Sequence, residues 1–264
     1  MSAQRHNGMA MATEHATTDG RPVEEAEFER RTRDKWREVP STRQGRAFSS
    51  ELLDWPDDRL LEFWEEARAE MSVQPVRGWF HERYAAAFCG RRVADVGPGI
   101  GIDGITLAEH GARITFVDIV EDNLALLQRL CGLKGVEADF YFIDDFFNYR
   151  FATRFDAFMF IGSMHHAPFE FSRRQAAAMT AFLEPGGTVV MLAYPKERFI
   201  ATGARDFEEF ARRTDGARTP WAEWYDEEKV CRLFGPAFRL NWSRRFGQQD
   251  IEFIWFDLTK ASAQ

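Results

Sequence analysis

A glycine-rich segment between a short apolar strand and a helix constrains this chain more than any other feature. Residues 93–96 read as a buried strand, and Gly97, Gly99 and Gly101 follow it before a helix expected over 102–109. Such a turn presents backbone N–H groups, and the helix N-terminus adds partial positive charge, so the segment favours an anionic group. The pattern predicts an α/β sheet with a ligand at this strand end.

An acidic residue ends the next expected strand. Residues 113–118 end in Asp118, at the position where nucleotide-binding sheets hold a ribose diol with an acid. The dinucleotide fingerprint G-x-G-x-x-G/A needs a glycine or alanine where this chain has Ile102. Here the glycines alternate instead, and Asp95 lies in the strand before them. These residues predict a nucleoside-type cofactor, with a dehydrogenase-type Rossmann domain as the alternative.

The segment resembles the first motif of the class I S-adenosylmethionine (SAM)-dependent methyltransferases, D/E-x-G-x-G-x-G. The resemblance implies that the glycine turn lets the backbone approach SAM, that Asp95 lies near its amino-acid end and that Asp118 binds its ribose. Residues 183–187, Leu-Glu-Pro-Gly-Gly, resemble the L-x-P-G-G before the fifth strand of many members. The resemblance covers about residues 91–260. It implies an α/β, Rossmann-like sheet of seven strands, mostly parallel, with one antiparallel strand.

Composition limits the classes of function. The chain has 264 residues, enough for one α/β domain with additions, and a net charge of −8, which argues against a surface that follows nucleic-acid phosphates. Its three cysteines are widely separated, which favours buried thiols in a reducing cytoplasm. No apolar stretch is long enough to span a membrane. We therefore expect a cytoplasmic protein that binds neither nucleic acid nor membrane.

The expected elements alternate between strand and helix, as in a parallel sheet. Strands are expected over 92–96, 113–118, 138–143, 155–161, 188–194, 238–246 and 251–259. Helices are expected over 23–39, 56–71, 76–88, 102–109, 120–133, 146–149 and 172–183. The regions expected are a disordered tail (1–22), an N-terminal helical cover (23–90), and a SAM-binding domain (91–260) whose insertion at 195–235 lines the acceptor pocket.

Two acids follow the third expected strand. The resemblance implies that an acid or amide here contacts N6 of adenine, which makes Asp144 and Asp145 candidates. Either side chain also suits the N-cap of the short helix expected after them. We favour Asp144 for adenine, with Phe142 and Phe146 against the faces of the ring.

The fourth expected strand ends in Ile-Gly-Ser-Met-His-His, residues 161–166, beside the reactive end of the expected cofactor. His165 is a candidate general base for an acceptor O–H or N–H, because the pKa of imidazole is near neutral. The alternative is that His165 only shapes the pocket wall, and His166 is expected to be structural. No metal site is expected, because adjacent side chains point apart and the other histidines are scattered.

Aromatic residues are expected to form the acceptor pocket, because aromatic faces stabilise sulfonium and ammonium cations. The candidates are Tyr84, Tyr194, Trp221, Trp224 and Tyr225. Large aromatic residues also anchor loops by their buried area alone, which is the competing interpretation.

These features predict an enzyme that transfers the SAM methyl group to an oxygen or nitrogen of a small molecule. One alternative is an enzyme that cyclises the aminobutyrate arm of SAM and releases methylthioadenosine. Another is a protein that binds SAM without catalysis. Methylation of RNA or protein is disfavoured by the charge and by the lack of the matching motifs, and the oligomeric state is not predicted.

Overall fold

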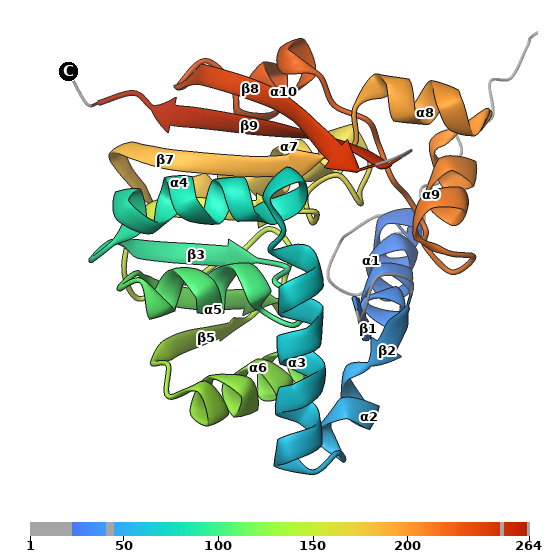
Figure 1. Ribbon diagram of the computed structural model, residues 1–264. Coiled ribbons are helices and arrows are strands. Elements are labelled where there is room, and N and C mark those ends of the chain that lie inside the picture. Colours follow the sequence, from blue (N-terminus) through green and yellow to red (C-terminus); the bar gives the residue numbers. More distant parts are fainter. Residues whose placement is uncertain (1–22, 41–44, 249–250, 263–264) are drawn as a thin grey trace, which may run out of the picture.

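Seven strands form one central sheet in the order β5-β4-β3-β6-β7-β9-β8 (Figure 1). The computed structural model describes residues 23–40, 45–248 and 251–262, so the tail expected over 1–22 lies outside the described residues. The strands are β3 (Arg92–Val96), β4 (Arg113–Asp118), β5 (Ala138–Phe142), β6 (Phe155–Ile161), β7 (Leu183–Ala193), β8 (Phe238–Gln248) and β9 (Ile251–Lys260). β9 pairs antiparallel with β7 and β8, and the other neighbours are parallel. The predicted sheet is confirmed.

Helices cover both faces of this sheet (Figure 1). One face carries α4 (Trp79–Phe88), α5 (Ile102–Glu109) and α6 (Glu121–Lys134), and the other carries α7 (Phe169–Thr180) and α10 (Glu227–Phe234). The remaining helices are α1 (Val23–Lys35), α2 (Ser49–Leu53), α3 (Asp57–Met71), the π-helical turn η1 (Gln74–Gly78), α8 (Lys196–Thr202) and α9 (Phe207–Asp215).

Alternate residues of each strand enter two different cores. In β3, Val93 packs on the α4–α6 side, whereas Ala94 and Val96 pack on the α7 side. The same alternation in β6 sends Met159 to the first core and Phe158 to the second. Side chains point alternately to the two faces of a strand, so strands covered on both faces are apolar throughout. This explains the nearly continuous apolar runs of the sequence.

The N-terminal segment, residues 23–40 and 45–48, lies across the carboxyl ends of the central strands (Figure 1). It contains α1 and a small antiparallel pair, β1 (Glu38–Pro40) and β2 (Arg46–Phe48). The helix predicted over 23–39 ends at Lys35, and the β1–β2 pair was not predicted. Three residues per strand give too short a pattern to separate from a loop.

Two further expectations are corrected. Residues 146–149 form no helix, because the side chains of Asp144 and Asp145 accept hydrogen bonds from the backbone of Asp145 and Phe147 and so stabilise tight turns. Residues 183–187 do not only form a turn before the fifth strand. They begin β7, where Leu183 pairs with Phe155 before a shift of register.

Candidate active site

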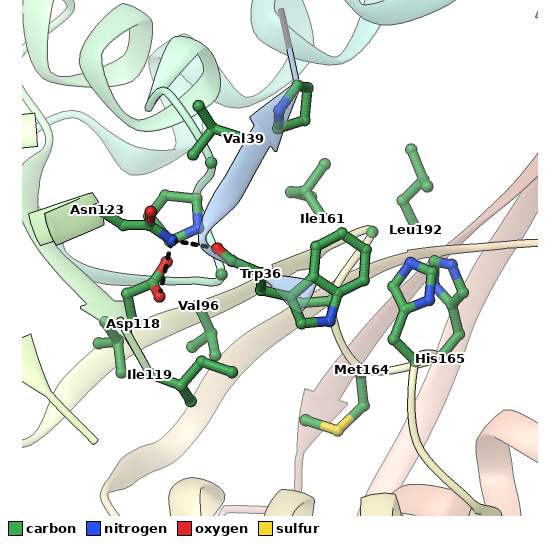
Figure 2. A pocket seen from close by; sticks show the side chains of 18 of the residues that line it. Trp36, Val39, Val96, Asp118, Ile119, Asn123, Ile161, Met164, His165 and Leu192 are labelled. Atoms are coloured by element: carbon green, nitrogen blue, oxygen red, sulfur yellow. Dashed lines mark hydrogen bonds between the residues drawn. The ribbon is translucent and has the colours of Figure 1, made fainter. Parts of the chain in front are cut away.

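One cavity of about 280 Å³ lies between the carboxyl ends of the central strands and the N-terminal segment. Side chains and backbone from both parts line it, as the close view in Figure 2 shows. At one end lie Gly97, Gly99, Asp118, Asn123, Ile143 and Phe146. At the other lie Arg46, His165, His166, Tyr194, Asp215 and Phe253. In this view the Trp36 side chain lies between Asp118 and His165. A ligand in this cavity would therefore contact both parts of the chain.

The glycine turn forms a wall of the cavity that only glycine permits. Gly97 has φ 68°, and a Cβ atom there would lie 2.7 Å from Cβ of Ser163. At Gly99, with φ 60°, a Cβ atom would lie 3.1 Å from Cδ of Pro40 in the N-terminal segment. Gly101 does not line the cavity. It precedes α5 with φ 72°, and a Cβ atom there would meet Leu127 at 2.4 Å. Two predicted glycines thus border the cavity, and the third packs against α6.

Asp118 lies where predicted, at the end of β4, and is linked to the N-terminal segment. Its Oδ1 accepts hydrogen bonds from the backbone N–H of Val120 at 2.9 Å and from Nδ2 of Asn123 at 3.2 Å. The same Nδ2 donates to the carbonyl oxygen of Trp36 at 2.9 Å (Figure 2). Asp118 is 4% exposed, and burial raises the pKa of its carboxyl group to about 7. Asp118 therefore titrates near neutrality in this state.

Asp95 lies beneath the glycine turn and does not line the cavity. It is 1% exposed, and burial followed by the nearby charge of Asp103 raises its pKa well above the usual value. Asp103 does border the cavity, and it accepts hydrogen bonds from Nη1 of Arg77 at 2.6 Å and from Nε2 of His81 at 2.7 Å. Arg77 borders the cavity beside the glycine turn. Arg77 was not predicted, because it belongs to no motif and precedes the turn by about twenty residues.

Asp144 and Asp145, predicted for adenine, do not line the cavity, although Ile143 and Phe146 beside them do. Arg33 of α1 binds the backbone beside these two acids. Arg33 was not predicted from the sequence either. Nη1 of Arg33 donates to the carbonyl oxygens of Ile119 at 2.7 Å and Ile143 at 2.8 Å, and Nη2 donates to that of Asp144 at 2.8 Å. Its guanidinium carbon lies 4.7 Å from the centre of the Phe146 ring. Arg33 thus ties the N-terminal segment to the ends of β4 and β5.

His165 and His166 both line the cavity, and their ring centroids are 4.1 Å apart. The expectation that these adjacent side chains point apart is wrong. His165 is 1% exposed, and apart from the backbone of Leu192 its ring nitrogens have no hydrogen-bond partner among the described residues. Burial, followed by the neighbouring His166 and Arg198, lowers its pKa well below the usual value, so its ring is neutral at pH 7. Neutral imidazole offers one donor and one acceptor nitrogen.

Four of the five aromatic residues predicted for the acceptor pocket lie outside the cavity; only Tyr194 lines it. Trp221 donates to Glu223, Trp224 lies against Lys229, and Tyr225 is fully buried in the core on the α7 side. Tyr84 projects from α4 and donates to Oδ2 of Asp257 at 2.5 Å. It borders a separate pocket with Thr188, near the other end of β7. The phase of α4 sets the position of Tyr84, and the path of the loop before α10 sets the positions of Trp221, Trp224 and Tyr225.

No group of three or more His, Cys, Asp or Glu side chains converges as metal ligands do within residues 23–40, 45–248 and 251–262. In the same ranges, no helix combines the length and apolar character needed to cross a bilayer.

Residues 93–187 match a family described as a methyltransferase domain. Over these residues the chain is similar to a methyltransferase domain. The matched residues include the glycine turn, Asp118 and His165, whereas Arg46 and Tyr194 lie outside them.

Curated relatives of this methyltransferase domain are named ubiquinone biosynthesis O-methyltransferase. The protein from Bordetella bronchiseptica is 34% identical over 124 residues, which are 45% of this chain and 48% of the relative. The protein from Methylococcus capsulatus is 27% identical over 173 residues, 60% of this chain and 71% of the relative. The chain thus spans about half, or less, of the length of the curated relatives that are more than 30% identical to it.

Solved structures share the fold of the methyltransferase domain. Magnesium protoporphyrin IX methyltransferase from Synechocystis PCC 6803, with bound S-adenosylhomocysteine (SAH), matches with a TM-score of 0.56 and 16% identity, over 70% of this chain and 81% of that one. The N-methyltransferase NodS from Bradyrhizobium japonicum, in complex with SAH, matches with a TM-score of 0.54 and 15% identity, over 80% and 96%. The cyclase SpnF matches with a TM-score of 0.56 and 14% identity, over 76% and 83%.

Proposed function

We propose that this protein binds SAM and transfers its methyl group to an oxygen or nitrogen of a small-molecule acceptor. The observation that carries the proposal is one cavity with two unlike ends. The glycine turn and Asp118 form one end, and the buried imidazole of His165 forms part of the other. A cofactor-binding end that adjoins an enclosed polar end holds donor and acceptor together, which is the main requirement for a displacement reaction.

The side chains and backbone at the cofactor end suit the chemistry of SAM. Gly97 and Gly99 carry no Cβ, so the backbone lies open to the methionine part, and Arg77 is placed beside them to bind its carboxylate. Asp118 would accept hydrogen bonds from the ribose hydroxyls. Asp95 and Gly101 would shape this end from outside the cavity. Ile143 and Phe146 replace Asp144 and Asp145 as the residues proposed against adenine.

At the other end, the chain supplies shape and a proton acceptor. SAM provides an electrophilic methyl group; the acceptor oxygen or nitrogen forms the new bond to carbon as the carbon–sulfur bond breaks. The unprotonated nitrogen of His165 would accept a hydrogen bond from the acceptor O–H or N–H and take its proton. Its lowered pKa makes it a weak base, so its larger contribution is to orient the acceptor. The surrounding walls exclude water.

The relatives favour oxygen over nitrogen, because they are named O-methyltransferases. Methylation of a nucleic acid is disfavoured by the net charge of −8. We also propose a cytoplasmic location, because Cys89, Cys131 and Cys231 are all unpaired. The expectation that all three thiols are buried is wrong, because Cys89 and Cys231 are exposed.

A second candidate function is cyclisation of SAM itself, with release of methylthioadenosine. The fold is compatible with reactions other than methyl transfer, since a cyclase shares it. A third candidate is binding without turnover.

Mass spectrometry separates these functions. The purified protein is incubated with SAM alone and then with pools of hydroxylated and aminated small molecules. Methyl transfer yields SAH and an acceptor heavier by one methylene, only when an acceptor is present. Methylthioadenosine from SAM alone would identify cyclisation, and intact SAM in every pool would favour a binding protein. In each case Asp118→Ala is the control, because a real activity must fall with the loss of cofactor binding.

A further inference from the structure

The acceptor end of the cavity contains an arginine that the methyl-transfer chemistry does not use. Arg46 of β2 borders the cavity, and its Nη2 lies 3.3 Å from Oδ1 of Asp215. The hydroxyl of Tyr194 donates to the same Oδ1 at 2.9 Å, and that of Thr214 donates to Oδ2 at 2.8 Å. Both oxygens of Asp215 are therefore occupied by donors from the chain. This carboxylate fixes Arg46 and Tyr194 at one wall of the cavity.

The second terminal nitrogen of Arg46, Nη1, is buried and has no hydrogen-bond partner among the described residues. Arginine is always charged and has no acceptor, so an unpaired buried N–H of its guanidinium is costly. The guanidinium carbon lies 5.0 Å from the centre of the Trp36 ring, which limits how far the group can turn. A ligand oxygen in the cavity would remove this cost.

The acidic side chains at this end of the cavity already have partners. Glu38 pairs with Lys35 at 3.4 Å and with Arg218, and Asp215 accepts from Arg46, Tyr194 and Thr214. His165 and His166 have lowered pKa values because they are buried, and they add no charge at pH 7. The unpaired Nη1 of Arg46 is therefore left to bind a negatively charged group of a ligand.

Resting on the proposed function, we propose that the acceptor is a small hydroxylated carboxylic acid: its carboxylate binds Nη1 of Arg46, and the hydroxyl to be methylated faces His165. Tyr194 connects the two groups, because its ring lies 4.4 Å from that of His165 and its hydroxyl shares Asp215 with Arg46. The flat rings of Trp36 and Tyr194 border the space between them, so an aromatic acid fits this end best.

The test compares an acid with its ester. Isothermal titration calorimetry measures the binding of 3,4-dihydroxybenzoate and of methyl 3,4-dihydroxybenzoate to the protein saturated with SAH. We expect the acid to bind at least about tenfold more tightly, because the ester keeps the hydroxyls and the ring but loses the charge-assisted bond. Arg46→Gln should remove the preference and leave the affinity for SAH unchanged. Arg46→Lys keeps the positive charge but loses the planar pair of guanidinium N–H donors. It should retain part of the preference for the acid.

Arg174→Gln is the matched control, because Arg174 also fastens the N-terminal segment, through Glu25 at 2.6 Å, but does not line the cavity. It should keep the full preference for the acid. Equal binding of acid and ester, including no binding of either, overturns the proposal. So does a loss of SAH binding in folded Arg46→Gln, which would assign Arg46 to the cofactor. Failure of the unmodified protein to bind SAH would instead overturn the proposed function itself.

Discussion

Nδ2 of Asn123 donates a hydrogen bond to the backbone carbonyl of Trp36 at 2.9 Å, and so fastens α6 to the N-terminal segment. The same nitrogen contacts Asp118 at 3.2 Å. The acid proposed to bind the ribose is therefore joined through one amide to the segment that covers the cavity. A ligand that draws hydrogen bonds from Asp118 will affect this connection.

Replacement of Asn123 by alanine should weaken both the fold and the binding of SAH. Two hydrogen bonds are lost, and the partly buried carbonyl of Trp36 loses its partner, so we expect the free energy of unfolding to fall by about 1–3 kcal/mol. The affinity for SAH should fall about tenfold. Thermal denaturation with and without SAH measures both effects. Asn148→Ala, at an exposed position, is the control and should change neither.

The affinity for SAH should depend on pH through Asp118. Its pKa is raised by burial to about 7, and the ribose hydroxyls need the ionised carboxylate as an acceptor. The carboxyl group is protonated below that pKa, so the affinity for SAH should rise as the pH increases through 7 and level off above it. Below the pKa, the affinity should fall by up to about tenfold for each pH unit. Calorimetry in buffers of different ionisation enthalpy should show proton release. An unchanged profile in Asp118→Asn would assign the dependence to another group.

Gly97→Ala should be more damaging than Gly90→Ala. Both residues have positive φ, 68° and 73°, so both substitutions carry a similar backbone strain of about 1 kcal/mol. A Cβ atom at Gly97 would also lie 2.7 Å from Cβ of Ser163, whereas nothing lies within 4 Å at Gly90. We expect a further loss of about 1–3 kcal/mol for Gly97→Ala, with loss of SAH binding. Chemical denaturation of both variants checks this, and equal losses would contradict it.

Tyr84→Phe should affect stability alone. The hydroxyl of Tyr84 donates to Asp257 at 2.5 Å and accepts from Nε1 of Trp255 at 3.1 Å, so two buried groups lose a partner. The free energy of unfolding should fall by about 1–3 kcal/mol. SAH affinity should not change, because Tyr84 does not border the cavity. A large loss of SAH affinity in a folded Tyr84→Phe variant would contradict this and support the original prediction that Tyr84 lines the acceptor pocket.

The cofactor end was more predictable than the acceptor end, for a physical reason. The turn at Gly97 and the acid at Asp118 are local features, fixed by a strand and the residues that follow it, and parallel strands bring their ends together. Arg46 and Arg77 border the cavity from the N-terminal segment and η1, and Arg33 binds the strand ends beside it. These contacts join residues far apart in the sequence, so no local sequence pattern predicts them.

The predicted aromatic residues show the same limit. Tyr84 and Tyr225 are apolar enough to be buried in either core, and composition does not tell which surface they meet. For Tyr84, the phase of α4 places its hydroxyl against β9. For Tyr225, the backbone N–H bonds to the carbonyl of Tyr194, and the side chain packs in the core on the α7 side. The prediction that residues after the fifth strand line the cavity was correct for Tyr194 alone among the candidate aromatic residues there.

The three hydrogen bonds from Arg33 to backbone carbonyl oxygens should affect the rate at which a ligand leaves the cavity. They tie the N-terminal segment to the strand ends beside Ile143, one of the residues proposed against adenine, so we expect a bound nucleoside to leave only after these bonds break. Release of SAH would then require the hydrogen bonds of Arg33 to break. We expect the dwell time of SAH, rather than the bond-making step, to set the pace of repeated turnovers.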